Sequence, residues 1–229
     1  MNNIKLITFD NPNISDVINL KANEELTLIT FNKGLSTTSY KLEANMKKSS
    51  TLHIYNIITT SYDSTIEEII NMNEENGFTE IINLFLGNAK SSITSNIKIN
   101  HNKALTTSNL EIYAIAKDEA KININNNAYI KNGSHKAMAH QKAKGLSLSK
   151  KAIIKGEPNL FIDDYDVIAS HACAIGSINQ EDLFYLMSRG LSEEEASKLI
   201  VMGFVSPILD KIENEELNKE IKNKFIEKL

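Results

Sequence analysis

The stretch Lys121-Ile-Asn-Ile-Asn125 alternates polar and apolar side chains residue by residue. A period of two places successive side chains on opposite faces of an extended backbone and predicts a β-strand. Segments of the same texture lie at residues 26–31, 52–57 and 146–149, separated by Asn, Gly, Lys and Ser. Few helix-length amphipathic blocks interrupt them over the first 168 residues. The sequence therefore predicts a mainly β fold, which could be a meander, a sandwich or a solenoid.

The connections between these segments favour a solenoid, although periodicity alone does not separate a solenoid from a sandwich. They are rich in asparagine, whose short polar side chain tolerates the left-handed backbone conformation of tight corners. One segment departs from the strand pattern. Residues 64–70 (Ser-Thr-Ile-Glu-Glu-Ile-Ile) are compatible with one or two turns of helix.

Beyond Gly176 the apolar residues follow a helical period, which predicts three short helices. Residues 177–180 (Ser-Ile-Asn-Gln) and 192–195 (Ser-Glu-Glu-Glu) have the spacing of capping boxes, so the first two helices should begin there. Gly190 and Gly203 stand where these helices should end. The third helix should begin near Ser206 and Pro207. We divide the chain into a β core, residues 1–176, whose end the helices cap, and a C-terminal helical segment, residues 177–229.

Composition excludes several classes of function. With 229 residues, of which 41% are hydrophobic, the chain can bury a sizeable core. Its apolar runs are far shorter than the roughly 20 residues of a membrane span, and its first residues do not resemble a signal peptide. We therefore expect a cytoplasmic protein that binds no membrane. The net charge of −4 and three glutamates at residues 193–195, at the start of a would-be recognition helix, argue against nucleic-acid binding.

Cysteine and arginine each occur once in the sequence, and both residues are candidates for a functional role. Cys173 is the single cysteine and follows His171 by two residues in the run 168–176 (IASHACAIG), so strand alternation places both side chains on one face. Arg189 is the single arginine. One interpretation is a cation in the last turn of a helix, where positive charge is favoured. The other is an interface residue whose planar guanidinium donates several hydrogen bonds to carboxylates or carbonyls.

Residues 157–190 carry a resemblance to a known family. They read EPNLFIDDYDVIASHACAIGSINQEDLFYLMSRG, and Ala196 and Gly203-Phe204 follow them. This run resembles the C-terminal signature of the SufB/SufD family of iron–sulfur cluster assembly proteins. Residues 101–110 and 137–149 are similar to the core of that family, so the resemblance extends over most of the chain beyond residue 20. Residues 170–176 are closer to SufD, because SufB-like members carry Glu-Ala-Thr after the histidine.

The resemblance implies a right-handed parallel β-helix, or β-solenoid, with a C-terminal α-helical segment, acting as a non-catalytic scaffold. In this family SufB and SufD pair through their β-helices, and the helical segment of each holds one copy of SufC, the ATPase that hydrolyses ATP. The expected partners are therefore SufC and either SufB or a second copy of this chain. The matched residues expected at the partner interface are Phe184, Tyr185, Arg189, Gly190 and Phe204.

The family's cluster-building histidine falls on His171. The resemblance therefore makes His171 the expected metal ligand for a nascent iron–sulfur cluster, with no cofactor permanently bound. A neutral imidazole suits iron, and the alternative is a histidine packed at a strand end. Cys173 is a second candidate ligand, although relatives carry Ala, Ser or Thr there. The SufB cysteine would fall near residues 144–149, which contain none, so this chain is not expected to be the primary sulfur acceptor.

A carbohydrate-active enzyme is the alternative function for a β-solenoid. Such a site needs clustered carboxylates or an activated nucleophile. Asp163, Asp164 and Asp166 form the tight acidic group of the β core. They could act only if they lined one open groove with a basic partner.

Overall fold

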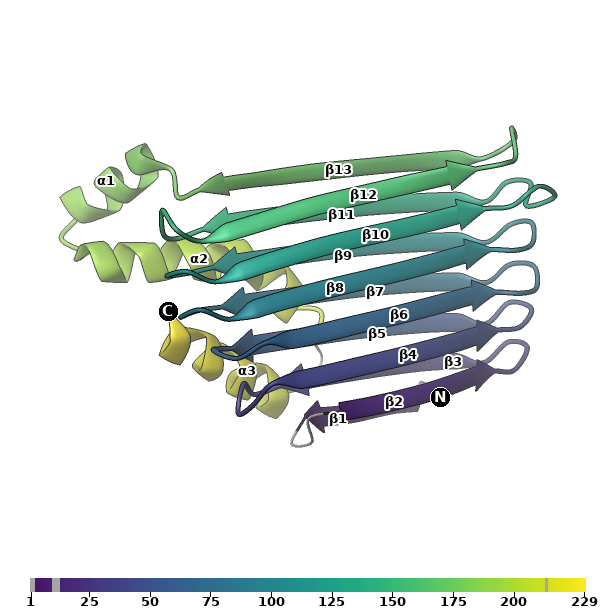
Figure 1. Cartoon of the computed structure of the whole chain (residues 1–229), viewed down its shortest axis with the longest axis horizontal. Helices are drawn as coiled ribbons and strands as arrows, with labels where there is room; N and C mark the ends of the chain where they lie inside the picture. Colours follow the sequence, from purple (N-terminus) through teal and green to yellow (C-terminus); the bar gives the residue numbers. More distant parts are fainter. Residues whose placement is uncertain (1–2, 10–12, 213) are drawn as a thin grey trace.

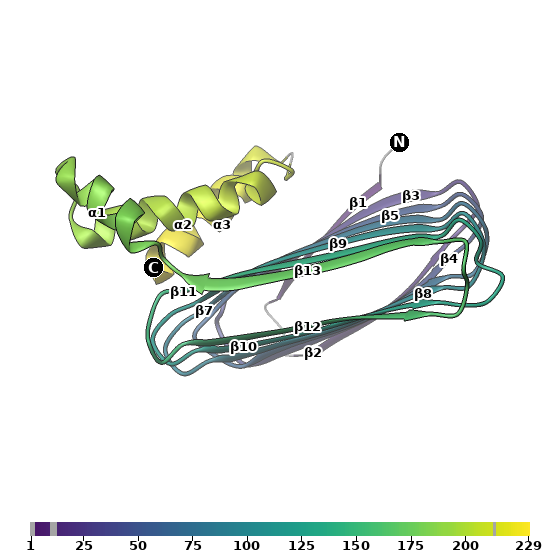
Figure 2. The ribbon, with the colours of Figure 1, turned by 90° about the horizontal axis from the view of Figure 1, so that it is seen from above.

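The computed structural model describes residues 3–9, 13–212 and 214–229. Within them the chain winds as a flattened coil of two facing sheets, with helices along one side (Figure 1). Seen from above, each turn lies almost directly on the one before it (Figure 2). Every strand pair is parallel and joins a strand to the strand two places along the chain. The fold is a β-solenoid, and the sandwich alternative is wrong.

The strands alternate between the two sheets. The seven-stranded sheet contains β1 (Asn3–Phe9), β3 (Glu25–Asn32), β5 (Thr51–Thr60), β7 (Phe78–Gly87), β9 (Thr107–Ala116), β11 (Met138–Ser147) and β13 (Ile168–Ser177). The six-stranded sheet contains β2 (Asn13–Leu20), β4 (Thr38–Met46), β6 (Ser64–Met72), β8 (Ser92–His101), β10 (Lys121–Ile130) and β12 (Ile153–Ile162). The helices α1 (Gln180–Ser188), α2 (Glu193–Leu209) and α3 (Glu215–Lys228) follow.

The segment that was compatible with helix is strand β6. Its side chains alternate between buried and less buried positions, with Ile66, Glu68 and Ile70 facing inward. The helical interpretation of residues 64–70 is therefore wrong. Strands β4 and β8 flank β6 and hydrogen-bond to it on both sides. This pairing holds the backbone extended, although the local sequence is compatible with either helix or strand.

The corners of the coil adopt the expected left-handed conformation, but asparagine is not their usual residue. Among the described residues, seven non-glycine residues have φ between 55° and 61°, and two of these are asparagines. The corner N–H groups of Ser49 and Leu105 donate to the carbonyls of Glu75 and His135, one turn further along. These hydrogen bonds between turns offset the cost of a positive φ. The left-handed conformation therefore depends more on the stacking of turns than on which residue occupies the corner.

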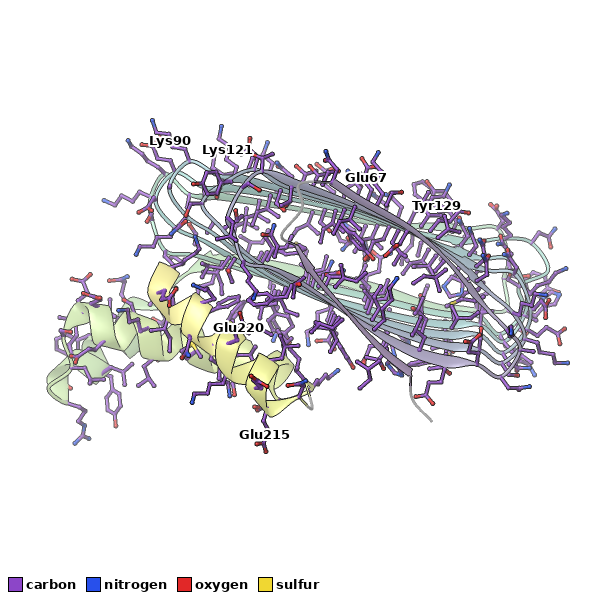
Figure 3. All side chains as sticks on the ribbon, turned by 90° about the horizontal axis from the view of Figure 1, so that it is seen from below. Glu67, Lys90, Lys121, Tyr129, Glu215 and Glu220 are labelled. Carbon is purple, nitrogen blue, oxygen red and sulfur yellow. The ribbon has the colours of Figure 1, made fainter. Side chains whose placement is uncertain are left out.

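The outer face of the six-stranded sheet carries a ladder of asparagines. Asn19, Asn45, Asn71 and Asn100 pair in register on successive turns. Each side-chain amide donates to the carbonyl oxygen of the asparagine one turn earlier, at 2.7 to 3.1 Å. Tyr129 follows Asn100 in the same column and lies on the side of the coil away from the helices (Figure 3).

The helices cover part of the outer face of the seven-stranded sheet, toward the C-terminal ends of its strands (Figure 2). They do not cap the end of the coil, so that expectation was wrong. Apolar side chains on this face, such as Leu84 and Ile115, share a core cluster with Val205 of α2 and Phe225 of α3. A lysine, Lys211, binds Glu80 of β7 at 2.8 Å. The covered face explains why the odd strands are apolar on both sides near their ends.

The helix boundaries differ from three of the expectations. Asn179, not the Ser177 box, caps α1, because Ser177 still belongs to β13. Helix α2 begins at the predicted capping box of Ser192 but continues through Gly203 and Pro207 to Leu209. Its buried residues on both sides of Gly203 keep it helical, since apolar burial outweighs the propensity cost of glycine and proline. The third helix therefore begins later, at Glu215, whereas Gly190 does follow the end of α1 with φ of 98°.

A buried carboxyl lies inside the coil. The Glu68 side chain accepts a hydrogen bond from Asn56 Nδ2 at 2.9 Å, and the same nitrogen donates to Asn83 Oδ1 at 2.8 Å. Among the described residues no donor reaches Glu68 Oε2. Burial raises the pKa of Glu68 to about 7, and the Asn56 hydrogen bond opposes the rise.

Replacing Glu68 by glutamine should flatten the pH dependence of stability. The folded protein keeps the Glu68 proton up to about pH 7, whereas the unfolded chain releases it near the ordinary pKa of 4.5. The folded state therefore binds more protons between these values, and the free energy of unfolding falls as pH rises through the window. We expect Glu68→Gln to reduce that fall by on the order of 3 kcal/mol, measured by urea unfolding at each pH.

The matched control is Glu67→Gln. Glu67 faces outward and pairs with Lys41 at 2.7 Å on the solvent side of the coil (Figure 3), where an ion pair contributes little. Equal pH profiles for wild type and Glu68→Gln would show that the interior carboxyl does not hold its proton.

Candidate functional site

The last turn of the coil, β12 and β13, is open. These strands end the two sheets, so within the described residues one backbone edge of each has no strand beside it. The change along one inward-facing column shows the effect. Ile81, Leu110 and Gln141 are buried, whereas the next residue in register, His171, is exposed. Positions that are buried between β3 and β11 are therefore accessible in this turn.

His171 faces the inside of the coil and contacts β12. Its Nδ1 lies 2.9 Å from the carbonyl oxygen of Pro158. A carbonyl can only accept, so Nδ1 must carry the proton in this hydrogen bond. In the neutral ring Nε2 is then the nitrogen with a free lone pair, which is the form of imidazole that binds a metal.

Cys173 lies on the same face and contacts the same strand. Its Sγ is 3.9 Å from the carbonyl oxygen of Gly156, and a Cβ added at Gly156 would lie 2.6 Å from that sulfur. Glycine at 156 therefore leaves the space that the thiol occupies. Burial raises the pKa of the Cys173 thiol, which lowers the fraction of reactive thiolate at neutral pH.

The two side chains do not make a metal site by themselves. Within the described residues no three His, Cys, Asp or Glu side chains come together to hold a metal ion. One imidazole nitrogen and one sulfur suit iron, and both lie at an edge that another chain could approach. A complete site would need donors from outside the part of the chain that the structure describes.

The residues expected at the partner interface fall into two groups. Phe184 and Tyr185 of α1 are 74% and 56% exposed, and the Arg189 guanidinium lies over the Tyr185 ring at 5.2 Å. Gly190 follows directly. Phe204 is separate, because it packs edge-on against Tyr113 of β9 at 5.4 Å, between α2 and the sheet.

Asp164, in the acidic corner between β12 and β13, holds the corner backbone through hydrogen bonds. The Asp164 carboxylate accepts the backbone N–H groups of Gly133 and Asp166 and lies 3.2 Å from His135 Nδ1. Backbone hydrogen bonds and His135 lower the pKa of Asp164, and its side chain is 1% exposed. Asp164 is therefore held by the corner and is not free to serve as one of a catalytic pair of carboxylates, whereas Asp163 and Asp166 are exposed.

Sequence reasoning missed the β12 side of the site. Gly156 and Pro158 supply the space and the carbonyl that Cys173 and His171 use. A signal was available, because proline inside a strand is confined to sheet edges and a glycine there marks a close approach. The side of His171 that faces Pro158 could not be predicted, since it depends on how successive turns stack.

The described residues include no helix of the length and hydropathy that a membrane span requires. Fold and open turn together define a parallel β-solenoid with an imidazole and a thiol at an exposed strand edge.

Comparison with known proteins identifies the family. The family model for the SufBD core domain of the SUF system for FeS cluster assembly matches residues 8–204. The iron–sulfur cluster assembly protein SufD of Bacillus subtilis is 38% identical over 109 residues, which are 48% of this chain and 25% of that protein. A SufBD family protein of Pyrococcus horikoshii is 49% identical over 79 residues, 34% of this chain and 17% of its own length. The chain thus aligns with a quarter or less of these relatives.

Since the family model covers most of the chain, this protein belongs to the SufB/SufD family of iron–sulfur cluster assembly proteins. The resemblance of residues 157–190 is confirmed, as is the parallel β-solenoid that it implied.

Replacing Gly156 by alanine should move the Cys173 sulfur away from β12 and further into solvent. The added methyl group takes the place of Sγ, so the sulfur must turn toward solvent, where its pKa falls toward the ordinary value. We expect a several-fold faster reaction with a disulfide reagent at neutral pH. Gly176→Ala is the control, because a Cβ there meets nothing within 4 Å. An unchanged rate in Gly156→Ala would contradict the packing of the thiol against β12.

Proposed function

We propose that this chain is a SufD-like, non-catalytic scaffold subunit of a SufBCD-type complex in the cytoplasm. It pairs through the open turn with SufB or with a second copy of itself, and the nascent iron–sulfur cluster forms at that interface. The helical segment, residues 177–229, binds SufC, which hydrolyses the ATP. The β core, residues 1–176, carries the cluster-binding side chains.

The orientation of His171 is the observation that carries the proposal. The Pro158 carbonyl holds the proton on Nδ1 and leaves Nε2 available to iron. The side chain lies in the exposed turn, with Cys173 on the same face. A ligand set completed by another chain suits a cluster that must leave, because separating the chains removes donors from the metal.

The unpaired strand edges support pairing with a second solenoid. β12 and β13 present backbone N–H and C=O groups with no neighbouring strand in the described structure. Open edges of this kind invite association with another strand. A partner coil placed against them would bring its own side chains toward His171.

The exposed face of α1 supports the docking of SufC. Phe184 offers a large apolar surface on a short helix that lies away from the coil (Figure 1). The Arg189 side chain stacks on Tyr185 and is held with its guanidinium beside this surface. Aromatic and arginine side chains are the types that most often dominate binding energy at interfaces.

The His171→Ala variant should lose cluster formation while keeping its fold. The side chain is exposed, so its removal leaves little unpacked volume and the melting temperature should stay close to wild type. In a complex reconstituted with SufB and SufC, we expect the absorbance of the newly formed cluster to fall to background. The control is His140→Ala, whose side chain faces outward and lies 2.7 Å from Ser170 Oγ. A full cluster yield from His171→Ala would refute the assignment.

The Phe184→Ala variant should weaken SufC binding by about tenfold or more, as expected for an aromatic anchor at an interface. Ile226→Ala on α3 is the control, because that side chain is also exposed and apolar. Titration calorimetry measures binding, and a thermal melt shows whether the helices remain folded. Equal affinities in wild type and Phe184→Ala, with equal melts, would place the SufC surface elsewhere.

A further inference from the structure

Polar atoms without partners lie inside the coil, one turn below His171. Asn126 of β10 is fully buried, and neither Oδ1 nor Nδ2 meets a hydrogen-bonding partner among the described residues. Gln141 of β11 is 4% exposed, and its Oε1 is likewise unpartnered within the described chain. Buried polar atoms are rarely left in this state, and a hidden water is a common reason.

Register and one hydrogen bond relate the positions of the two amides inside the coil. Gln141 Nε2 crosses the interior and donates to the carbonyl oxygen of Asn159 at 3.2 Å. Asn159 pairs in register with Asn127, the neighbour of Asn126. The Gln141 side chain therefore reaches β12 beside Pro158, the residue that pairs in register with Asn126 one turn earlier.

We propose that Asn126 and Gln141 together bind a buried water molecule inside the coil. Such a water can accept from Asn126 Nδ2 and donate to Gln141 Oε1, which satisfies atoms of both amides with ordinary hydrogen-bond geometry. Both side chains are neutral, so the site offers no charge to attract an ion. Ala128, two residues after Asn126, and Ala143, two residues after Gln141, also face the interior. They are smaller than Ile99 and Ile112, which hold the same register positions one turn earlier.

Gln141 also connects the water site to the strand that contacts His171. Gln141 holds the Asn159 carbonyl, and the preceding residue, Pro158, supplies the carbonyl that fixes the His171 tautomer. A water on Oε1 keeps the Gln141 amide in the orientation in which Nε2 donates to β12. The site lies within the coil and does not depend on the proposed role of His171 in cluster assembly, so the two can fail separately.

A crystal structure of the whole chain, at a resolution that shows ordered water, tests the proposal. We expect a density peak about 2.7–3.2 Å from both Gln141 Oε1 and an Asn126 amide atom. Asn56 is the internal control, because it is equally buried and its amide already donates to Glu68 and Asn83. The Gln141→Met variant keeps a similar length without the polar atoms, and its structure should lack the peak.

Two crystallographic results would overturn the proposal. One is a direct hydrogen bond between the amides of Asn126 and Gln141 with no peak between them. The other is a peak at about 2.0–2.4 Å from the amide oxygens, which is a cation distance. If Gln141→Met does not fold, nuclear Overhauser contacts from the Asn126 amide protons of the wild-type chain to a long-lived water decide the question. Their absence would then count against the site.

Discussion

Parallel stacking of successive turns, one strand directly on the next, is the constraint from which the other features of this protein follow. The backbone N–H and C=O groups of each strand bond to the turns above and below. The surroundings of a residue therefore depend on its column, the set of residues in register with it on successive turns, as much as on its neighbours in the chain. Columns explain the asparagine ladder on the outer face, whose amides repeat at the spacing of the turns. They also explain why corner residues as different as Ser49 and Leu105 adopt one conformation, because each must donate its N–H to the next corner.

The same constraint leaves one end of the coil open. A coil has no way to satisfy the outer edges of its last strands, and here those strands are β12 and β13. The helices, which could have covered this end, lie on the flank of the seven-stranded sheet (Figure 2). An inward-facing column that is buried from Leu28 of β3 to Gln141 of β11 therefore ends in an accessible imidazole. The position of His171 follows from where the coil stops, and Pro158 and Gly156 on the facing strand adapt the backbone to it.

The sequence predicted the class of fold well and the details of its ends poorly. Alternation in stretches such as residues 121–125 reports a local property, the extended backbone, and this was correct. Residues 64–70 were misread because two adjacent pairs of like residues hide the period that only stacking on β4 and β8 reveals. Gly203 and Pro207 were misread as helix boundaries because their local propensities are outweighed by apolar burial against the sheet. The shared face of His171 and Cys173 was predictable from alternation, whereas the carbonyl that selects the His171 tautomer belongs to another strand and was not.

Apolar packing inside the coil decreases toward the open end, and this decrease bears on the proposed pairing with another chain. One inward column runs from Ile81 and Leu110 to Gln141 and then His171, while its neighbour runs from Ile112 to Ala143 and Cys173. Large aliphatic side chains give way to amides, alanine and groups that can bind metal, so the last turns gain less from apolar burial and depend more on backbone hydrogen bonds. Regions with few buried apolar contacts open more readily than the core. Under the proposed pairing, such a turn would adjust its edge to a partner and would gain stability from the strand contacts that the partner supplies.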